Sequence, residues 1–123
     1  MGVQVNWEDD EHRIIRVDLL GRWKWSEFYT AFDGVKTMIT SVPHTVHIIS
    51  MIENPFHVPA NPLFHINNFV RNAPANFGVN YIVGANKYAE PFLPIASRFY
   101  PHIISKIQFA ATVDEAKTLM KQS

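Results

Sequence analysis

A glutamate and several histidines around a proline-rich segment are the side chains best suited to chemistry. Glu53 and His57 are four positions apart and follow a predicted strand, an arrangement typical of an acid–base pair. Together with His65 they would form the set of two histidines and one carboxylate that many transition metals accept. The six histidines lack the spacing of a strong metal motif, which favours positions in loops, on the surface or in the interior. We therefore predict neither an enzyme nor a metal site, with the Glu53/His57 pair as the alternative.

Other reactive signatures are missing from the sequence. The chain contains no cysteine, which excludes disulfides, thiolate metal sites and cysteine nucleophiles. Its five glycines are not spaced as a phosphate-binding loop, and no serine lies in a Gly-x-Ser-x-Gly elbow. We predict that the protein uses no cofactor.

The aromatic residues offer two further signals. The segment from Arg22 to Trp25 alternates two cations with two indole rings, which if exposed would stack on bases or lie at a membrane surface. The structural interpretation, which we favour, places Trp25 in the core stripe of a helix and Trp23 over the sheet edge. Phe56 lies in the proline-rich segment without a periodic partner. It is either an exposed contact residue or a ring folded back onto its own loop.

The composition describes one ordinary folded domain spanning residues 1–123. Lys plus Arg number 11 and Asp plus Glu number 11, so the chain lacks the positive excess of a nucleic-acid binder. The N-terminal residues lack the basic start and apolar core of a secretory signal. No apolar run approaches the roughly 20 residues that cross a bilayer. We expect a cytoplasmic protein with no membrane span and no nucleic-acid partner.

The N-terminal half predicts a hairpin followed by the clearest helix of the chain. Strands are expected at 3–7 and 13–21, where apolar and polar residues alternate. Over 25–42, apolar residues recur at spacings of three and four and therefore share one face. These residues are Trp25, Phe28, Phe32, Val35, Ile39 and Val42. Ser26 is the expected N-cap, and Gly34 inside the helix predicts a close packing contact.

The C-terminal half alternates strands with helices. The remaining strands are expected at 45–52, 79–84 and 107–111. The first of these indicates burial on both faces. A short helix begins at Pro62 with Asn61 as its N-cap, and a final helix is capped by Thr112. Between them, a helix over 88–105 presents an apolar stripe of Phe92, Ile95, Ala96, Phe99 and Ile103. Pro101 is expected to end or kink this helix.

These elements predict an α/β fold in the order β-β-α-β-α-β-α-β-α. Their alternation favours a mostly parallel central sheet with an N-terminal hairpin and with helices packed on it. In such sheets, ligands and partners meet the loops at the C-terminal ends of the strands. Those loops are residues 53–61 and 85–90. They place the candidate binding residues, which are Asn54, Phe56, His57, Asn61, Lys87 and Tyr88.

Four segments also carry a resemblance to a known family. They are the hairpin ending Leu19-Leu20-Gly21, the amphipathic helix after it, the strand Val46-His47-Ile48-Ile49, and the ending from Phe109 to Ala116. Their order resembles the STAS domain of bacterial anti-sigma-factor antagonists, whose layout the Sec14-like lipid-binding modules share. The resemblance implies a single STAS-like domain that acts as a regulator. Switching antagonists carry a phosphorylated serine after the third strand, whereas no Ser, Thr or Tyr occurs between Ser50 and Phe64 here.

Two functions follow from these observations. The favoured one is a non-enzymatic protein-interaction module that contacts a protein partner or a second copy of itself as a homodimer. The alternative is a small apolar-ligand or lipid-binding protein of Sec14-like type. In that case helices 63–73 and 88–104 line a pocket, and the prolines at 91, 94 and 101 let the second helix bend away. The alternative requires a pocket of several hundred cubic ångströms, and the interaction module does not.

Overall fold

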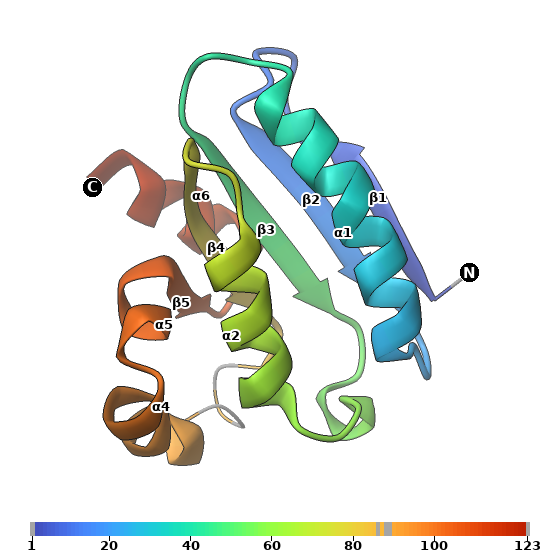
Figure 1. The fold of residues 1–123 in the computed structure, drawn as a ribbon, viewed down its shortest axis with the longest axis vertical. Coiled ribbons are helices and arrows are strands. Elements are labelled where there is room, and N and C mark those ends of the chain that lie inside the picture. Colours follow the sequence, from blue (N-terminus) through green and yellow to red (C-terminus); the bar gives the residue numbers. More distant parts are fainter. Residues whose placement is uncertain (1, 86, 88–89, 123) are drawn as a thin grey trace.

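One mixed sheet of five strands, in the order β1-β2-β3-β4-β5, organises the chain (Figure 1). The strands are β1 (Val3–Trp7), β2 (Ile14–Leu19), β3 (Val46–Ile52), β4 (Phe77–Val83) and β5 (Ile107–Ala110). β1 pairs antiparallel with β2, and the other strands continue parallel to β2. The computed structural model describes residues 2–85, 87 and 90–122. The predicted α/β class, with a mostly parallel sheet behind an N-terminal hairpin, is confirmed.

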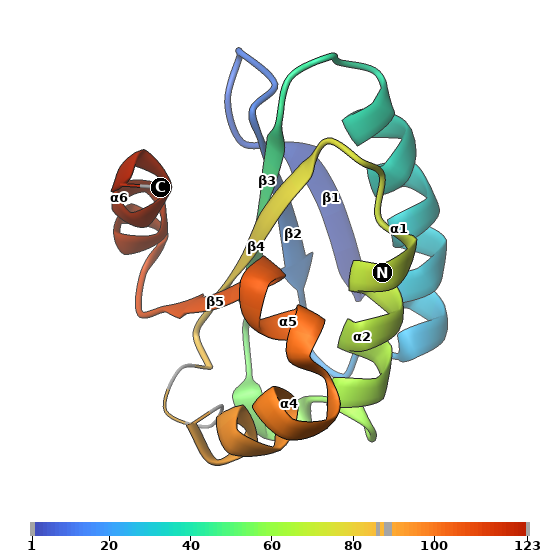
Figure 2. The same cartoon turned by 60° about the vertical axis from the view of Figure 1, so that its left-hand side comes forward.

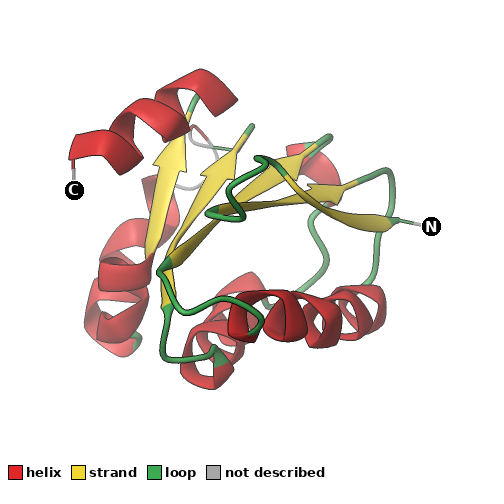
Figure 3. Cartoon of the chain, turned by 90° about the horizontal axis from the view of Figure 1, so that it is seen from above, coloured by secondary structure: helices red, strands yellow, loops and turns green. Residues whose placement is uncertain are grey.

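The helices cover the two faces of the sheet unequally. They are α1 (Trp25–Thr40), α2 (Pro62–Asn72), α4 (Leu93–Phe99), α5 (Pro101–Lys106) and α6 (Val113–Gln122), with two 3₁₀ turns, η1 (Pro55–His57) and η2 (Glu90–Phe92). Because the strands follow one another across the sheet in chain order, right-handed crossovers place α1, α2 and α5 on one face. The C-terminal helix α6 lies on the opposite face, as Figures 2 and 3 show. Within the described residues, no helix combines the length and the hydropathy needed to cross a membrane.

Neighbouring residues of β3 belong to two different hydrophobic cores, one on each face of the sheet. Ile48 belongs to the core that also contains Ile39 of α1. Its neighbour Ile49 belongs to the core in which Tyr81 of β4 and Ala116 of α6 meet. Both isoleucines are buried, which confirms the prediction that this strand is covered on both faces. β3 is therefore the rigid centre from which the loops at its end are positioned.

Helix α1 confirms the predicted apolar stripe and corrects its beginning. The buried members of the stripe are Phe32, Val35 and Ile39. The N-cap residue is Lys24 and not Ser26. The Glu27 carboxylate accepts hydrogen bonds from the backbone N–H groups of Gly2 (2.9 Å) and Lys24 (3.1 Å), and these bonds lower the pKa of Glu27. The predicted close contact at Gly34 is wrong, because a Cβ there would meet nothing within 4 Å.

The prediction that Pro101 ends or kinks the helix over 88–105 is confirmed. Its described part consists of η2, α4 and α5, and the backbone leaves helical geometry at Tyr100 (φ −136°, ψ 63°), just before Pro101. Because the break turns the chain, the predicted stripe does not face one surface. Of its members, Ala96 and Ile103 are buried, whereas Phe92, Ile95 and Phe99 are exposed.

His47 is a half-buried histidine that links two strands of the sheet. Its Nδ1 atom accepts a hydrogen bond from the backbone N–H of Val79 (3.0 Å). Burial, and then the nearby positive charge of Lys106, lowers the pKa of the His47 ring. The neutral ring therefore joins β3 to β4 as a hydrogen-bond acceptor, which fits the expectation of a packed histidine.

Candidate binding site

The parallel strands deliver three loops to one edge of the sheet. β2, β3 and β4 all end there, and they are followed by residues 20–24, 53–61 and 84–92. In Figure 1 this carboxyl edge lies at the lower end of the molecule, where η1, the start of α2 and α4 also gather. The topology therefore brings the loops that the sequence singled out to one edge of the sheet.

An apolar pocket of about 340 Å³ lies at this edge. Its walls come from the loop after β3, from the first turns of α2, from the ends of β3 and β4, and from η2 and β5. The lining residues are Ile52, Pro55, Val58, Pro59, Ala60, Pro62, Leu63, Ile66, Ile82, Ala85, Phe92 and Phe109. Every one of these side chains is apolar. The pocket can bind hydrocarbon, and none of the described residues that line it has a charged or hydrogen-bonding side chain.

Hydrogen bonds hold the proline-rich loop in the shape that forms this wall. The Asn54 side chain caps η1 by accepting from the backbone N–H of Phe56 (3.0 Å). The Glu53 carboxylate accepts from the backbone N–H of Gly21 (3.0 Å) and so joins the loop after β3 to the loop after β2. The Trp25 indole donates to the carbonyl of Ala60 (2.7 Å). The loop is therefore anchored at both of its ends.

A smaller chamber of about 60 Å³ lies next to the pocket, between α1, α2 and the sheet. The two cavities share five lining residues, which are Ile52, Val58, Pro62, Ile66 and Ile82. The chamber also has polar walls, since Ser50 donates a hydrogen bond to Asn80 (2.8 Å) within the sheet. Trp23 lines it too, is 4% exposed, and has an indole N–H without a hydrogen-bond partner among the described residues. A buried donor of this kind is costly unless an acceptor reaches it.

A cluster that sequence reasoning missed fixes helix α2 against α1. The Tyr29 hydroxyl and the Nδ1 atom of His65 are 2.6 Å apart, and Asn68 donates to the same hydroxyl (3.3 Å). The His65 ring also stacks on the Trp25 indole, with ring centroids 4.4 Å apart. The spacing of Trp25 and Tyr29 at i and i+4 was a signal for this cluster, because it places them on one face of α1.

Of the six predicted binding residues, the five that the structure describes do not line the pocket. Asn54 is half-buried in its capping role, whereas Phe56, His57 and Lys87 are exposed. Asn61 precedes α2 as predicted, with a left-handed backbone (φ 61°) and no side-chain cap. Tyr88 lies outside the described residues. The sequence therefore located the loop but not the side chains of that loop that line the pocket. The helices 63–73 and 88–104, which the ligand-binding alternative predicted as pocket walls, do contribute Leu63, Ile66 and Phe92.

The alternative chemistries find little support in the geometry. No hydrogen bond or ion pair joins Glu53 to His57, although both are described, and a contact through one water stays a prediction. His65 is already engaged by Tyr29 and Trp25. Among the described residues, no three side chains of the metal-binding types gather at one point. In the tetrapeptide from Arg22 to Trp25, the buried Trp23 and the hydrogen-bonded Trp25 confirm the structural interpretation of the two indoles.

Comparison with protein-family models, with curated proteins and with solved structures finds no match to this chain.

Proposed function

We propose that this chain is a binding protein, not a catalyst, and that it holds a small apolar ligand in the pocket at the carboxyl edge of the sheet. The observation that carries the proposal is the pocket of about 340 Å³ with an entirely apolar lining. Small-molecule sites commonly occupy about 300–1,000 Å³, so the volume suits a ligand at the small end of that range. The pocket favours the apolar-ligand hypothesis. The protein-interaction module stays a prediction.

The residues around the two cavities restrict the functional groups that the ligand can carry. No charged side chain lines either cavity within the described residues, so a charged group would lose its hydration without compensation. The unpartnered indole N–H of Trp23 instead suits one neutral acceptor. The ligand is therefore a mainly hydrocarbon molecule with a single carbonyl, ester or hydroxyl oxygen that reaches the chamber.

The relationship to STAS and Sec14-like domains belongs to the same proposal. It is supported by the antiparallel opening hairpin and by the alternation of elements on which the resemblance rests. The missing phosphoserine switch also agrees with the structure, because Ser50 is 5% exposed and donates its hydrogen bond to Asn80. A kinase would not reach this hydroxyl in the folded chain.

Ala60→Trp is expected to weaken binding of an apolar probe at least about tenfold, the equivalent of about 1.4 kcal/mol. Ala60 is exposed and lines the pocket, so a large side chain there obstructs it without entering the core. The probe is Nile red, a neutral apolar dye with a carbonyl group, and its fluorescence titration gives the dissociation constant. Ala75→Trp is the matched control, since Ala75 is also exposed but precedes β4 and lines no described pocket. Equal effects of the two variants, or no saturable binding by the parent chain, would refute the proposal.

Trp23→Phe is expected to remove a preference for ligands with an acceptor oxygen. Butyrophenone and butylbenzene differ by one carbonyl in place of a methylene group, and each is titrated as a competitor of Nile red. After correction for their partition from water, the parent chain should prefer the ketone about 2- to 10-fold, the range of one net hydrogen bond. The variant should bind both equally. A purely structural role of Trp23 would lower both affinities together and leave their ratio unchanged.

A further inference from the structure

Exposed apolar side chains gather at the same end of the molecule as the pocket. Phe56 in η1 is 73% exposed, Phe64 in the first turn of α2 is 52% exposed, and Phe99 at the end of α4 is 64% exposed. Phe92, Leu93 and Ile95 are also exposed, and Ala96 is the buried residue of α4. Single exposed hydrophobic residues are ordinary, but a group contributed by three segments marks an interaction surface.

These residues form a continuous surface with the pocket. An open groove of about 620 Å³ runs between the start of α2 and α4, and Phe64, Phe92 and Phe99 line it. Pro62, Leu63 and Phe92 line both this groove and the 340 Å³ pocket. The apolar surface therefore begins where the pocket ends.

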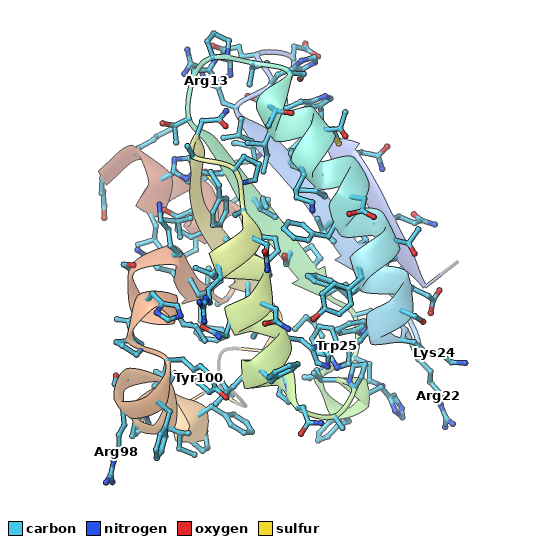
Figure 4. All side chains as sticks on the ribbon, in the orientation of Figure 1. Arg13, Arg22, Lys24, Trp25, Arg98 and Tyr100 are labelled. Atoms are coloured by element: carbon cyan, nitrogen blue, oxygen red, sulfur yellow. The ribbon has the colours of Figure 1, made fainter. Side chains whose placement is uncertain are left out.

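Four exposed cations surround this apolar surface. Arg22 and Lys24 come from the loop after β2, Lys87 from the loop after β4, and Arg98 from α4. None of the ion pairs in the described part of the chain involves them. Figure 4 shows Arg22, Lys24 and Arg98 at the lower end of the molecule, with Arg98 directed outward from α4.

The carboxylates are unevenly distributed between the two ends of the molecule. Glu27 and Glu53, which accept hydrogen bonds from backbone N–H groups, and Glu90 at the start of η2 lie at the same end as these cations. Among the described residues, this end therefore has four cations against three carboxylates. The segment 8–13 between β1 and β2, at the other end, has four carboxylates and one arginine. The chain has no net charge, but the apolar end is the less acidic of the two.

We propose that this end docks on the surface of an anionic membrane, without crossing it. The aromatic side chains of η1, α2 and α4 enter the boundary between headgroups and acyl chains, and the four cations contact lipid phosphates. Charge complementarity selects this occupant, because a bilayer with anionic headgroups presents negative charge over hydrocarbon along one broad surface. The proposal goes beyond ligand binding, because docking needs no ligand in the pocket.

Co-sedimentation with lipid vesicles tests the proposal. The full chain is mixed with vesicles of phosphatidylcholine alone or of phosphatidylcholine with phosphatidylglycerol, at low and at high salt. The expected result is sedimentation with the anionic vesicles that weakens with added salt, and little sedimentation with phosphatidylcholine alone. Absence of binding to anionic vesicles, or equal binding to both compositions, would overturn the proposal.

Charge reversals at the two ends of the molecule show whether vesicle binding depends on the position of the cations or on net charge alone. Arg22→Glu with Lys24→Glu is expected to lower the vesicle partition coefficient at least about tenfold. Arg13→Glu with Lys121→Glu is the control, because it changes the net charge by the same amount. Arg13 is exposed at the opposite end of the molecule in Figure 4, and Lys121 is exposed on α6. Thermal unfolding confirms that each variant is folded. An equal loss in the control would show that net charge alone is responsible and would overturn the assigned docking surface.

Replacing the exposed aromatic residues distinguishes a membrane from a second copy of the chain. Phe64→Ser with Phe99→Ser is expected to reduce vesicle binding while light scattering reports an unchanged molar mass. A dimer that these substitutions dissociate, without vesicle binding by the parent chain, would assign the surface to self-association and overturn docking. Nile red binding is scored separately, so failure of the pocket and failure of membrane docking are told apart.

Discussion

Gly84→Ala is expected to lower the free energy of unfolding by at least about 2 kcal/mol. Gly84 ends β4 with φ +97°, a backbone conformation that residues with a side chain rarely adopt. A Cβ atom at this position would lie 2.6 Å from the carbonyl oxygen of Ile52 in the neighbouring strand. Because that contact is with backbone, no side chain can move aside to relieve it. Urea unfolding followed by circular dichroism measures the effect.

Gly34→Ala is the matched control for this prediction. It makes the same chemical change in the middle of α1, where the glycine is exposed and a Cβ would meet nothing within 4 Å. Alanine should therefore raise the free energy of unfolding by about 0.5–1 kcal/mol, because it favours the helical backbone. Two variants that change stability in the same direction would contradict the argument for Gly84.

Gly84 also affects the shape of the apolar pocket, because two of its close neighbours line it. The next residue, Ala85, lines the apolar pocket, and Ile52, whose carbonyl approaches Gly84, lines it as well. The close approach of the two strand ends thus forms one side of the pocket. We expect the alanine variant to lose Nile red affinity even at temperatures where it remains folded.

Asn76→Ala is expected to lower the free energy of unfolding by about 2 kcal/mol. The Asn76 side-chain amide donates to three backbone carbonyls. The carbonyl of Ile39 (2.7 Å) belongs to the last turn of α1, and those of Val42 (3.2 Å) and His44 (2.9 Å) follow the helix. The last carbonyls of a helix have no partner within the helix. Removing the amide leaves the carbonyls of Val42 and His44 without this donor, and leaves the Ile39 carbonyl with the long bond from the Val42 N–H (3.5 Å). Urea unfolding measures the cost.

A second asparagine provides the control for Asn76. Asn72 is exposed and donates one hydrogen bond, to the carbonyl of Asn68 in its own helix (2.7 Å). Asn72→Ala should change stability by no more than about 0.5 kcal/mol, as is usual for surface substitutions. Asn72 ends α2 and Asn76 immediately precedes β4, so both lie at the edge of the sheet opposite the pocket. Nile red affinity should therefore stay unchanged in each folded variant. A cost at Asn72 equal to that at Asn76 would refute the helix-end role.

The apolar residues of α1 and β3 show which features are readable from sequence. The i, i+3 and i+4 spacing of Phe32, Val35 and Ile39 predicted the buried face of the helix, and that face packs on the sheet. The mostly apolar sequence of β3 predicted burial on both faces, as Ile48 and Ile49 confirm. Such patterns are informative because each depends on residues a few positions apart.

Helix α4 shows where the same reasoning fails. Phe92, Ile95 and Phe99 have helical spacing, yet they are exposed because Pro101 ends the segment and no other described element covers it. Periodicity states that apolar residues share a face, but it does not state what that face contacts. The failed prediction is also the observation on which the docking surface depends.

The sequence alone determines two features: the alternation of strands and helices, and the edge of the sheet at which the loops 53–61 and 85–90 begin. Local periodicity and the rule for parallel strands suffice for both. The pocket itself depends on the folded arrangement. Its lining comes from β3, the loop after it, α2, β4, η2 and β5, which are far apart along the chain. The orphaned donor of Trp23 and the gathering of four cations likewise arise from contacts that no local pattern encodes. Long-range packing therefore determines what this edge of the sheet can bind.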